Sequence, residues 1–197
     1  MSLAQLAAAC TAQTTLVTPL GPVLLARTEV GLAGAWFEGQ KAHPGVLAAP
    51  QADADPLLCE AARQIEAYFA GHRSNFDLPL DLQGTAFQRK VWQALRCIDR
   101  GRTSSYADIA QAIGSPGAVR AVGAAVGRNP VSVIVPCHRV IGSDGSLTGY
   151  AGGLPRKEAL LRLEGVAGIG TAESTGRACA AARPAHAGQG LPGLAGA

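Results

Sequence analysis

The sequence predicts an α/β protein of the α+β type, in which a small antiparallel sheet with one helix precedes a mostly helical segment. Short β-rich runs separated by turn residues fill the first forty residues, and from residue 84 onward apolar residues recur at helical spacing. A chain of 197 residues with 48% hydrophobic residues can bury one core or two small ones. We expect domains at 1–83 and 84–165, followed by a disordered Ala/Gly/Pro-rich tail at 166–197.

The first segment is predicted to hold three strands and then a helix. The β-rich runs lie at 14–18, 23–26 and 31–37. Asp55 followed by Pro56 is typical of an N-cap and a first helical position, so a helix is expected from there to Gly71. Residues 79–82 form either an edge strand or a connector.

The second segment is predicted to open with three helices, over residues 86–98, 105–114 and 118–126. Thr85 can cap the first, and Ser105 with Asp108 has the spacing of a capping box at the second. The short turn between the second and third helices makes them a candidate helix-turn-helix. A short buried strand is expected at 131–135, and a last helix begins at Pro155.

The third helix has an unusual composition for a surface that binds other molecules. Val119, Val122 and Val126 lie on one face and are expected to pack inward, whereas Arg120 is the only long side chain on the other face, beside Ala121. A helix that recognises base edges in the major groove normally carries several polar side chains. A smooth face with one arginine instead favours close approach to a minor groove. Packing against another helix is the alternative.

Charge is distributed unevenly along the chain. Residues 1–83 carry a net charge of −4 and residues 84–165 a net charge of +6, within a total of +3. A basic segment indicates a polyanionic partner, and ordinary surface variation is the alternative. No apolar run reaches the roughly 18 residues of a membrane span, and the N-terminus lacks a signal-peptide pattern. A cytoplasmic location is therefore expected.

The five cysteines include one with a distinctive setting. Cys137 follows the expected buried strand and a proline, and precedes His138 and Arg139. Neighbouring His or Arg lowers the pKa of a thiol, which makes Cys137 a candidate nucleophile, with a structural buried cysteine as the alternative. There is no Cys-x-x-Cys pair, so neither a zinc ribbon nor a thioredoxin-type motif is indicated.

Taken together, these features resemble the O6-alkylguanine-DNA alkyltransferases. Pro136-Cys137-His138-Arg139-Val140 matches the active-site signature of that family. Further matches in family order are Gly84-Thr85-x-Phe87-Gln88-x-x-Val91-Trp92, Ser105-Tyr106-x-x-Ile109-Ala110, Arg120-Ala121-Val122-Gly123, Asn129-Pro130, Gly149-Tyr150-x-Gly152-Gly153 and Lys157-x-x-Leu160-Leu161-x-x-Glu164-Gly165. The resemblance covers residues 84–165 strongly and residues 14–82 loosely.

The resemblance implies direct DNA repair. An O6-alkylated guanine in double-stranded DNA would be flipped into a pocket and its alkyl group transferred once to Cys137, with O4-alkylthymine as a further possible substrate. The implied catalytic residues are Cys137, His138, Glu164 and Tyr106, with His138, Glu164 and a water ionising the thiol and Tyr106 protonating the leaving base.

The resemblance also implies a set of DNA- and substrate-binding residues: Arg120, Ala121, Asn129, Arg139, Tyr150, Ala151, Gly152 and Lys157. Arg120 would fill the gap left by the flipped base, and Asn129 would hold the turn between recognition helix and active-site strand. Ala151 stands where some relatives have Ser, so only its backbone is expected to bind guanine. Some relatives hold zinc in the first domain, but the Cys and His residues here lack ligand spacing, so no metal is expected.

No cofactor is expected, and the protein should act as a monomer. Two rival functions are a lesion-binding protein of the alkyltransferase-like kind and a thiol hydrolase. Proteins of the first class lack the active-site cysteine, so the presence of Cys137 argues against that function. The second brings its histidine from a distant segment and needs an oxyanion hole, and its motifs are absent.

Overall fold

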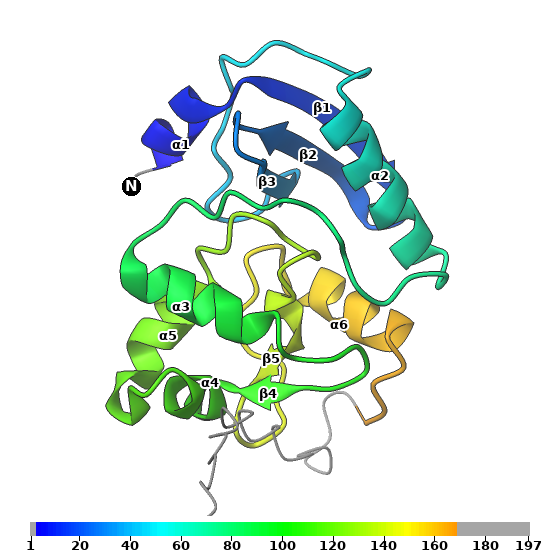
Figure 1. Ribbon diagram of the computed structural model, residues 1–197. Helices are drawn as coiled ribbons and strands as arrows, with labels where there is room; N and C mark the ends of the chain where they lie inside the picture. The colour runs from blue at the N-terminus through cyan, green and yellow to red at the C-terminus, as the bar shows by residue number, and fades with distance from the viewer. Residues whose placement is uncertain (1–2, 169–197) are drawn as a thin grey trace, which may run out of the picture.

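A computed structural model describes residues 3–168. Apart from its first three residues, the tail predicted at 166–197 lies outside the described residues. In Figure 1 the sheet and α2 (Pro56–Phe69) form the upper half of the molecule, and the helices of the second segment form the lower half. None of the helices in residues 3–168 is long and apolar enough to cross a membrane.

The predicted antiparallel sheet is present. Its strands β1 (Ala12–Thr18), β2 (Gly21–Arg27) and β3 (Leu32–Phe37) pair in sequence order. The connector at 79–82 adds a single bridge, in which Leu32 N donates to Pro79 O at 2.8 Å. A short helix, α1 (Leu3–Ala9), was not predicted, because alanine is too common in this chain to indicate a seven-residue helix.

Helix α2 begins where the sequence predicts. The Asp55 side chain accepts hydrogen bonds from the backbone N–H groups of Leu57 and Leu58, both at 3.0 Å, which satisfies two otherwise free donors of the first turn. Leu58 and Ile65 on its apolar face are buried against the sheet. The helix thereby carries Tyr68, near its end, into the shared interior of the protein.

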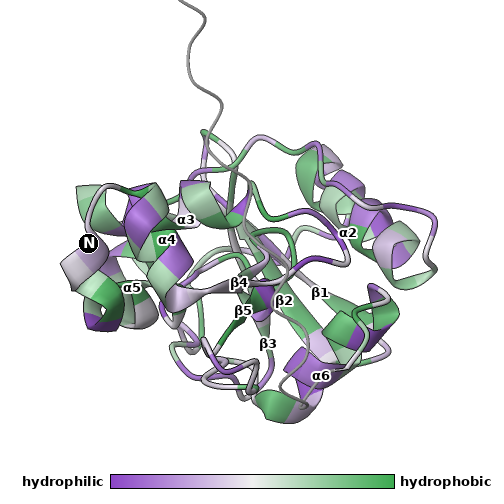
Figure 2. Cartoon of the chain, turned by 90° about the horizontal axis from the view of Figure 1, so that it is seen from below, coloured by the Kyte–Doolittle hydropathy of each residue, from purple (hydrophilic) through white to green (hydrophobic). Residues whose placement is uncertain are grey.

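The three helices predicted next are present as α3 (Ala86–Leu95), α4 (Tyr106–Ala112) and α5 (Val119–Val126). Capping boxes at Thr85 and Ser105 start the first two, and the 3₁₀ helix η1 (Pro116–Ala118) joins α4 to α5 as in a helix-turn-helix. Seen from below, α3, α4 and α5 group on one side of the molecule and α2 and α6 (Leu154–Leu163) on the other (Figure 2).

A pairing that sequence analysis missed positions the site. The parallel strands β4 (Ser104–Ser105) and β5 (Val140–Ile141) lie immediately before α4 and immediately after the 3₁₀ helix η2 (Cys137–Arg139). Each strand has only two residues, too few for a periodic pattern. Their pairing brings the start of α4 beside η2, which contains Cys137.

The predicted strand at 131–135 is wrong, although these residues are buried as expected. Only Val131 forms a bridge, to Ala35 of β3. Val133 then takes a left-handed φ of 72°, and Val135 N donates to Val131 O at 3.0 Å, which closes a turn. An apolar run does not distinguish a buried strand from a buried turn whose polar groups find partners elsewhere.

Both segments contribute to one main hydrophobic core. Leu25 and Phe37 of the sheet belong to the same buried cluster as Trp92 of α3 and Leu160 of α6. Trp92 also donates its indole N–H to the carbonyl of Ala125 in α5 at 2.9 Å. Because the core is shared, residues of the first segment can reach the site that the second segment provides.

Candidate active site

Cys137 lies at the start of η2, with only 2% of its surface exposed. Asn129 holds the turn that leads to it. The Asn129 amide donates to Val131 O at 3.3 Å, to Val135 O at 2.8 Å and to the Cys137 Sγ at 3.0 Å, and its oxygen accepts from Val131 N at 3.1 Å. One side chain therefore both fixes the buried turn and touches the thiol.

The carboxylate of Glu164 is the polar centre of the site. Its Oε1 accepts hydrogen bonds from Tyr68 Oη at 2.7 Å, from His138 Nε2 at 2.9 Å and from Arg139 Nη2 at 2.8 Å, and its Oε2 accepts from Arg139 Nε at 2.9 Å. Burial alone would raise the pKa of Glu164, but the hydrogen bonds from His138 and Arg139 outweigh it and lower the pKa. Glu164 is therefore ionised at neutral pH.

An ionised Glu164 decides which nitrogen of His138 carries the proton. A carboxylate only accepts hydrogen bonds, so the ring nitrogen that faces it, Nε2, must donate. Burial lowers the pKa of His138 more than the Glu164 hydrogen bond raises it, so the resting imidazole is neutral. Its Nδ1 is then a buried acceptor, and it has no hydrogen-bond partner among the described residues.

The environment of Cys137 contains opposing influences. Burial raises the pKa of the thiol, whereas the Asn129 hydrogen bond and the positive charge of Lys157 lower it. The net shift is upward, so the resting group is a thiol. Ionisation therefore requires a base, and the neutral His138 imidazole is the neighbouring residue that can accept a proton.

Two residues implied as DNA or substrate contacts do not fit that role. Lys157 is fully buried, and its Nζ donates to the carbonyls of Val140 and of Thr148, the latter at 2.6 Å. Burial lowers the pKa of Lys157 to about 8. Arg139 is 4% exposed and is engaged by Glu164 and by the carbonyl of Ile98. Neither cation can reach a phosphate from these positions.

Tyr106 reaches the site because β4 pairs with β5. It is the first residue of α4, it is half-buried, and its hydroxyl donates to the carbonyl of Gly149 at 3.2 Å. Burial raises the pKa of Tyr106, so its hydroxyl keeps its proton at neutral pH. The group is therefore a hydrogen-bond donor at the edge of the Gly-rich loop.

The Gly-rich loop folds its tyrosine over its own backbone. Tyr150 is 8% exposed, and a Cβ on Gly152 would lie 2.6 Å from its ring, so only glycine fits there. Gly153 N donates to Tyr150 O at 3.0 Å, which closes the turn before α6. The carbonyl of Ala151 accepts from Lys41 N at 2.9 Å, a contact from the first segment.

Helix α5 presents the small-residue face that the sequence predicts. Arg120 and Ala121 are exposed, and Val122 and Val126 are buried. The expected inward packing of Val119 is wrong, since its exposed fraction is 37%. Val119 is the first residue after η1, where the helix has not yet reached the core.

Tyr68 is the site residue that sequence reasoning missed. It lies 96 positions before Glu164 and belongs to the other segment, so no local motif connects the two. Burial raises the pKa of Tyr68, and the negative charge of Glu164 adds to the shift, so the hydroxyl stays a donor. The sequence signal for Tyr68 is its place on the apolar face of α2. That pattern predicts that the side chain is buried, but it does not identify the hydrogen-bond partner of the hydroxyl.

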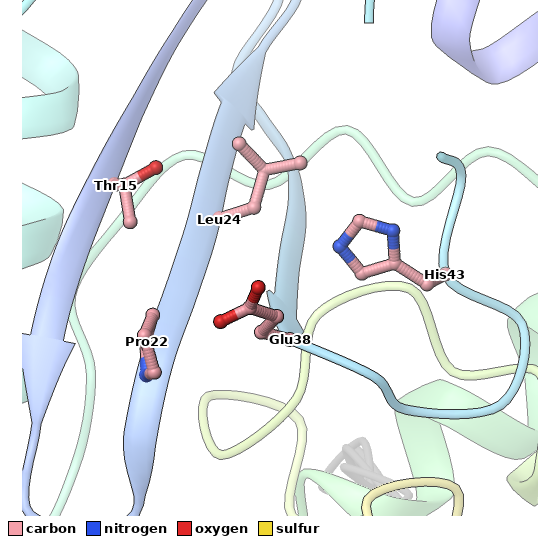
Figure 3. Close-up of a pocket in the computed structure, with 5 residues that line it drawn as sticks. All are labelled: Thr15, Pro22, Leu24, Glu38 and His43. Atoms are coloured by element: carbon pink, nitrogen blue, oxygen red, sulfur yellow. The ribbon is translucent and has the colours of Figure 1, made fainter. Parts of the chain in front are cut away.

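The first segment also carries a separate hollow of about 320 Å³ on the sheet. Thr15, Leu24, Glu38 and His43 turn toward one another there (Figure 3). None of the predicted site residues lines it. Within residues 3–168, no group of three or more His, Cys, Asp or Glu side chains is placed to hold a metal ion.

Replacement of Asn129 tests how the turn supports the thiol. Asn129→Leu keeps the volume but leaves the N–H of Val131 without a partner, while the carbonyl of Val135 keeps only the hydrogen bond from Cys137 N at 2.8 Å. We expect a loss of about 1–3 kcal/mol in the free energy of unfolding by urea, which is the cost of leaving one buried N–H group unsatisfied. The control Arg128→Leu changes the exposed neighbour and should cost less than about 0.5 kcal/mol. Equal losses in both variants would contradict the assignment.

Two family models match the chain. The model described as "6-O-methylguanine DNA methyltransferase, ribonuclease-like domain" matches residues 12–82, and "6-O-methylguanine DNA methyltransferase, DNA binding domain" matches residues 86–166. A methylated-DNA–protein-cysteine methyltransferase of Methanosarcina acetivorans is 50% identical over 151 residues, which are 75% of this chain and 94% of the relative.

Further relatives agree with this assignment. The constitutive methylated-DNA–protein-cysteine methyltransferase of Bacillus subtilis is 46% identical over 154 residues, 75% of this chain and 91% of the relative. A crystal structure of Mycobacterium tuberculosis OGT in complex with DNA matches with a TM-score of 0.72 and 47% identity, over 78% of this chain and 92% of that chain. The chain belongs to the methylated-DNA–protein-cysteine methyltransferase family.

Proposed function

We propose that this protein repairs DNA directly, by moving the alkyl group of an O6-alkylguanine in duplex DNA to Cys137. The observation that carries the proposal is the buried arrangement of Cys137, a neutral His138 and an ionised Glu164 in a chain of this family. In this proposal, residues 84–165 form the domain that binds DNA and carries the reacting groups, and residues 1–83 form a supporting domain. A monomer in the cytoplasm suffices for this reaction.

The first step is ionisation of the thiol. We propose that the proton of Cys137 passes through one water molecule to Nδ1 of His138, the ring nitrogen that has no partner among the described residues. The imidazolium that forms is stabilised by Glu164, which already accepts from Nε2 at 2.9 Å. Asn129 and Lys157 stabilise the thiolate through a hydrogen bond and a positive charge.

The second step is displacement at the alkyl carbon. The thiolate sulfur forms a bond to that carbon while the bond from carbon to guanine O6 breaks, and its electron pair stays on the base. Tyr106 donates a proton to the base, which neutralises the charge that would otherwise make guanine a poor leaving group. The imidazolium of His138 then returns its proton through solvent to the Tyr106 phenolate, so the net reaction moves the thiol proton to the base and the alkyl group to sulfur.

The substrate pocket would be walled by the loop that contains Tyr150, Ala151 and Gly152. Helix α5 would lie along the minor groove, because its exposed face carries small residues and would admit close approach. Arg120 is the long exposed side chain on this face, so it would occupy the space that the flipped nucleotide vacates.

Mass spectrometry tests the proposed function. After incubation with duplex DNA that carries O6-methylguanine, the peptide that contains Cys137 should gain one methyl group, and transfer should stop at one group per chain. The thioether that forms keeps its alkyl group because a thiolate leaves poorly from an unactivated carbon, and the sequence has no Cys-x-x-Cys pair that could remove the group. Cys137→Ala should abolish transfer and still bind the methylated duplex. A continuing steady rate, or a methyl group on another residue, would contradict the proposal.

Arg120 is tested by comparing two substrates. Arg120→Ala should slow single-turnover repair of duplex DNA by about tenfold or more, because unstacking a base costs a few kcal/mol and about 1.4 kcal/mol corresponds to a factor of ten. Transfer from free O6-benzylguanine, which needs no base flipping, should change less than about twofold. The same slowing with both substrates would show that Arg120 does not assist flipping.

A further inference from the structure

Arg156 of α6 connects the Gly-rich loop to the first segment. Its Nε donates to the carbonyl of Leu20 at 2.9 Å, its Nη1 to the carbonyl of Gly152 at 3.2 Å, and its Nη2 to the carbonyl of Glu38 at 3.2 Å. Leu20 lies in the turn between β1 and β2, and Glu38 follows β3. One guanidinium therefore joins three separate pieces of backbone.

The chemistry of these contacts requires arginine. All three acceptors are backbone carbonyls, and the planar guanidinium presents its donors in fixed directions that reach them at the same time. The guanidinium carbon also lies 4.9 Å from the centroid of the buried Phe37 ring, a cation–π contact. A lysine ammonium offers a single nitrogen and cannot span three carbonyls on different segments.

A second contact fixes the same loop from the same side. Lys41 N donates to the carbonyl of Ala151, so two consecutive residues of the loop, Ala151 and Gly152, are held by hydrogen bonds. Tyr150 packs directly over Gly152. Any shift of the Gly152 backbone must therefore move the Tyr150 ring.

We infer that Arg156 is a positioning residue that fixes the Tyr150–Gly152 wall of the base pocket against the first segment. The kinetic consequence of this inference rests on the proposed function. The three hydrogen bonds of Arg156 to the carbonyls of Leu20, Glu38 and Gly152, called the clamp below, are a property of the fold. The first segment thereby sets how tightly the flipped base is held, in addition to supplying Tyr68, which hydrogen-bonds Glu164. Arg156 touches neither the Cys137 thiol nor His138. Its loss should therefore weaken binding of the flipped guanine more than it slows the alkyl transfer step.

Hydrogen exchange tests the clamp independently of repair activity. Arg156→Met keeps an unbranched chain of similar reach and removes all three donors. The matched control is Arg162→Met on the same helix, since Arg162 is exposed and forms a surface ion pair with Glu158 at 2.6 Å. We expect amide exchange in the peptide that spans residues 150–153 to become about tenfold faster in Arg156→Met and to stay unchanged in Arg162→Met. Equal exchange in both variants would overturn the inference.

Single-turnover kinetics test the consequence for the pocket. With free O6-benzylguanine, Arg156→Met should raise the half-saturating concentration by about tenfold and change the rate constant at saturation by less than about twofold. Arg156→Lys, which retains the charge, should behave like Arg156→Met if the three-way fork is the essential feature, and it serves where Arg156→Met does not fold. Wild-type saturation constants in the lysine variant, or a fall only in the saturated rate, would overturn the positioning role. Absence of transfer by the wild-type protein would instead refute the proposed function. The hydrogen-exchange comparison would then still test whether Arg156 fixes the loop.

Discussion

The buried carboxylate of Glu164 joins parts of the molecule that are far apart in sequence. It ends α6, accepts from Tyr68 of α2, and binds both His138 and Arg139 of η2. Arg139 neutralises the buried negative charge, and Tyr68 satisfies a further acceptor site without adding charge. With these partners the carboxylate stays ionised and fixes the tautomer of His138. Nδ1 is then left as a buried acceptor, and the proposed uptake of the Cys137 proton depends on it, because burial raises the pKa of the thiol.

The buried cations have supporting roles that their charge alone does not reveal. Lys157 and Arg139 belong to motifs of a DNA-binding family, and a basic segment directs attention to phosphate contacts. In the structure their donors bind carbonyl and carboxylate oxygens inside the protein. Burial of Lys157 lowers its pKa and places a positive charge near Cys137. Sequence patterns give the sign of a charge, whereas its accessibility depends on tertiary packing.

Much of the fold could be predicted because local chemistry determines it. The Asp55 cap, the Ser105 capping box and the spacing of Val122 and Val126 depend on residues a few positions apart. The prediction of a strand at 131–135 failed because the Asn129 side chain binds backbone groups two and six positions later and favours a turn there, which an apolar run alone does not indicate. The β4–β5 pair, the Tyr68 contact and the Arg156 contacts were missed for a different reason: each joins residues that are distant in sequence, and short motifs do not indicate which distant residues meet.

The central claim of this account is that Glu164 activates Cys137 through His138. The pH dependence of single-turnover transfer tests it most directly, with wild type and Glu164→Gln compared from about pH 6 to about pH 9 on free O6-benzylguanine. Without the carboxylate, the imidazolium loses its stabilising charge, so the thiol should ionise less readily. The rising limb of the pH–rate profile should move to higher pH by about one unit, with partial recovery of the rate in alkali. An unchanged profile in a folded Glu164→Gln protein would contradict the account.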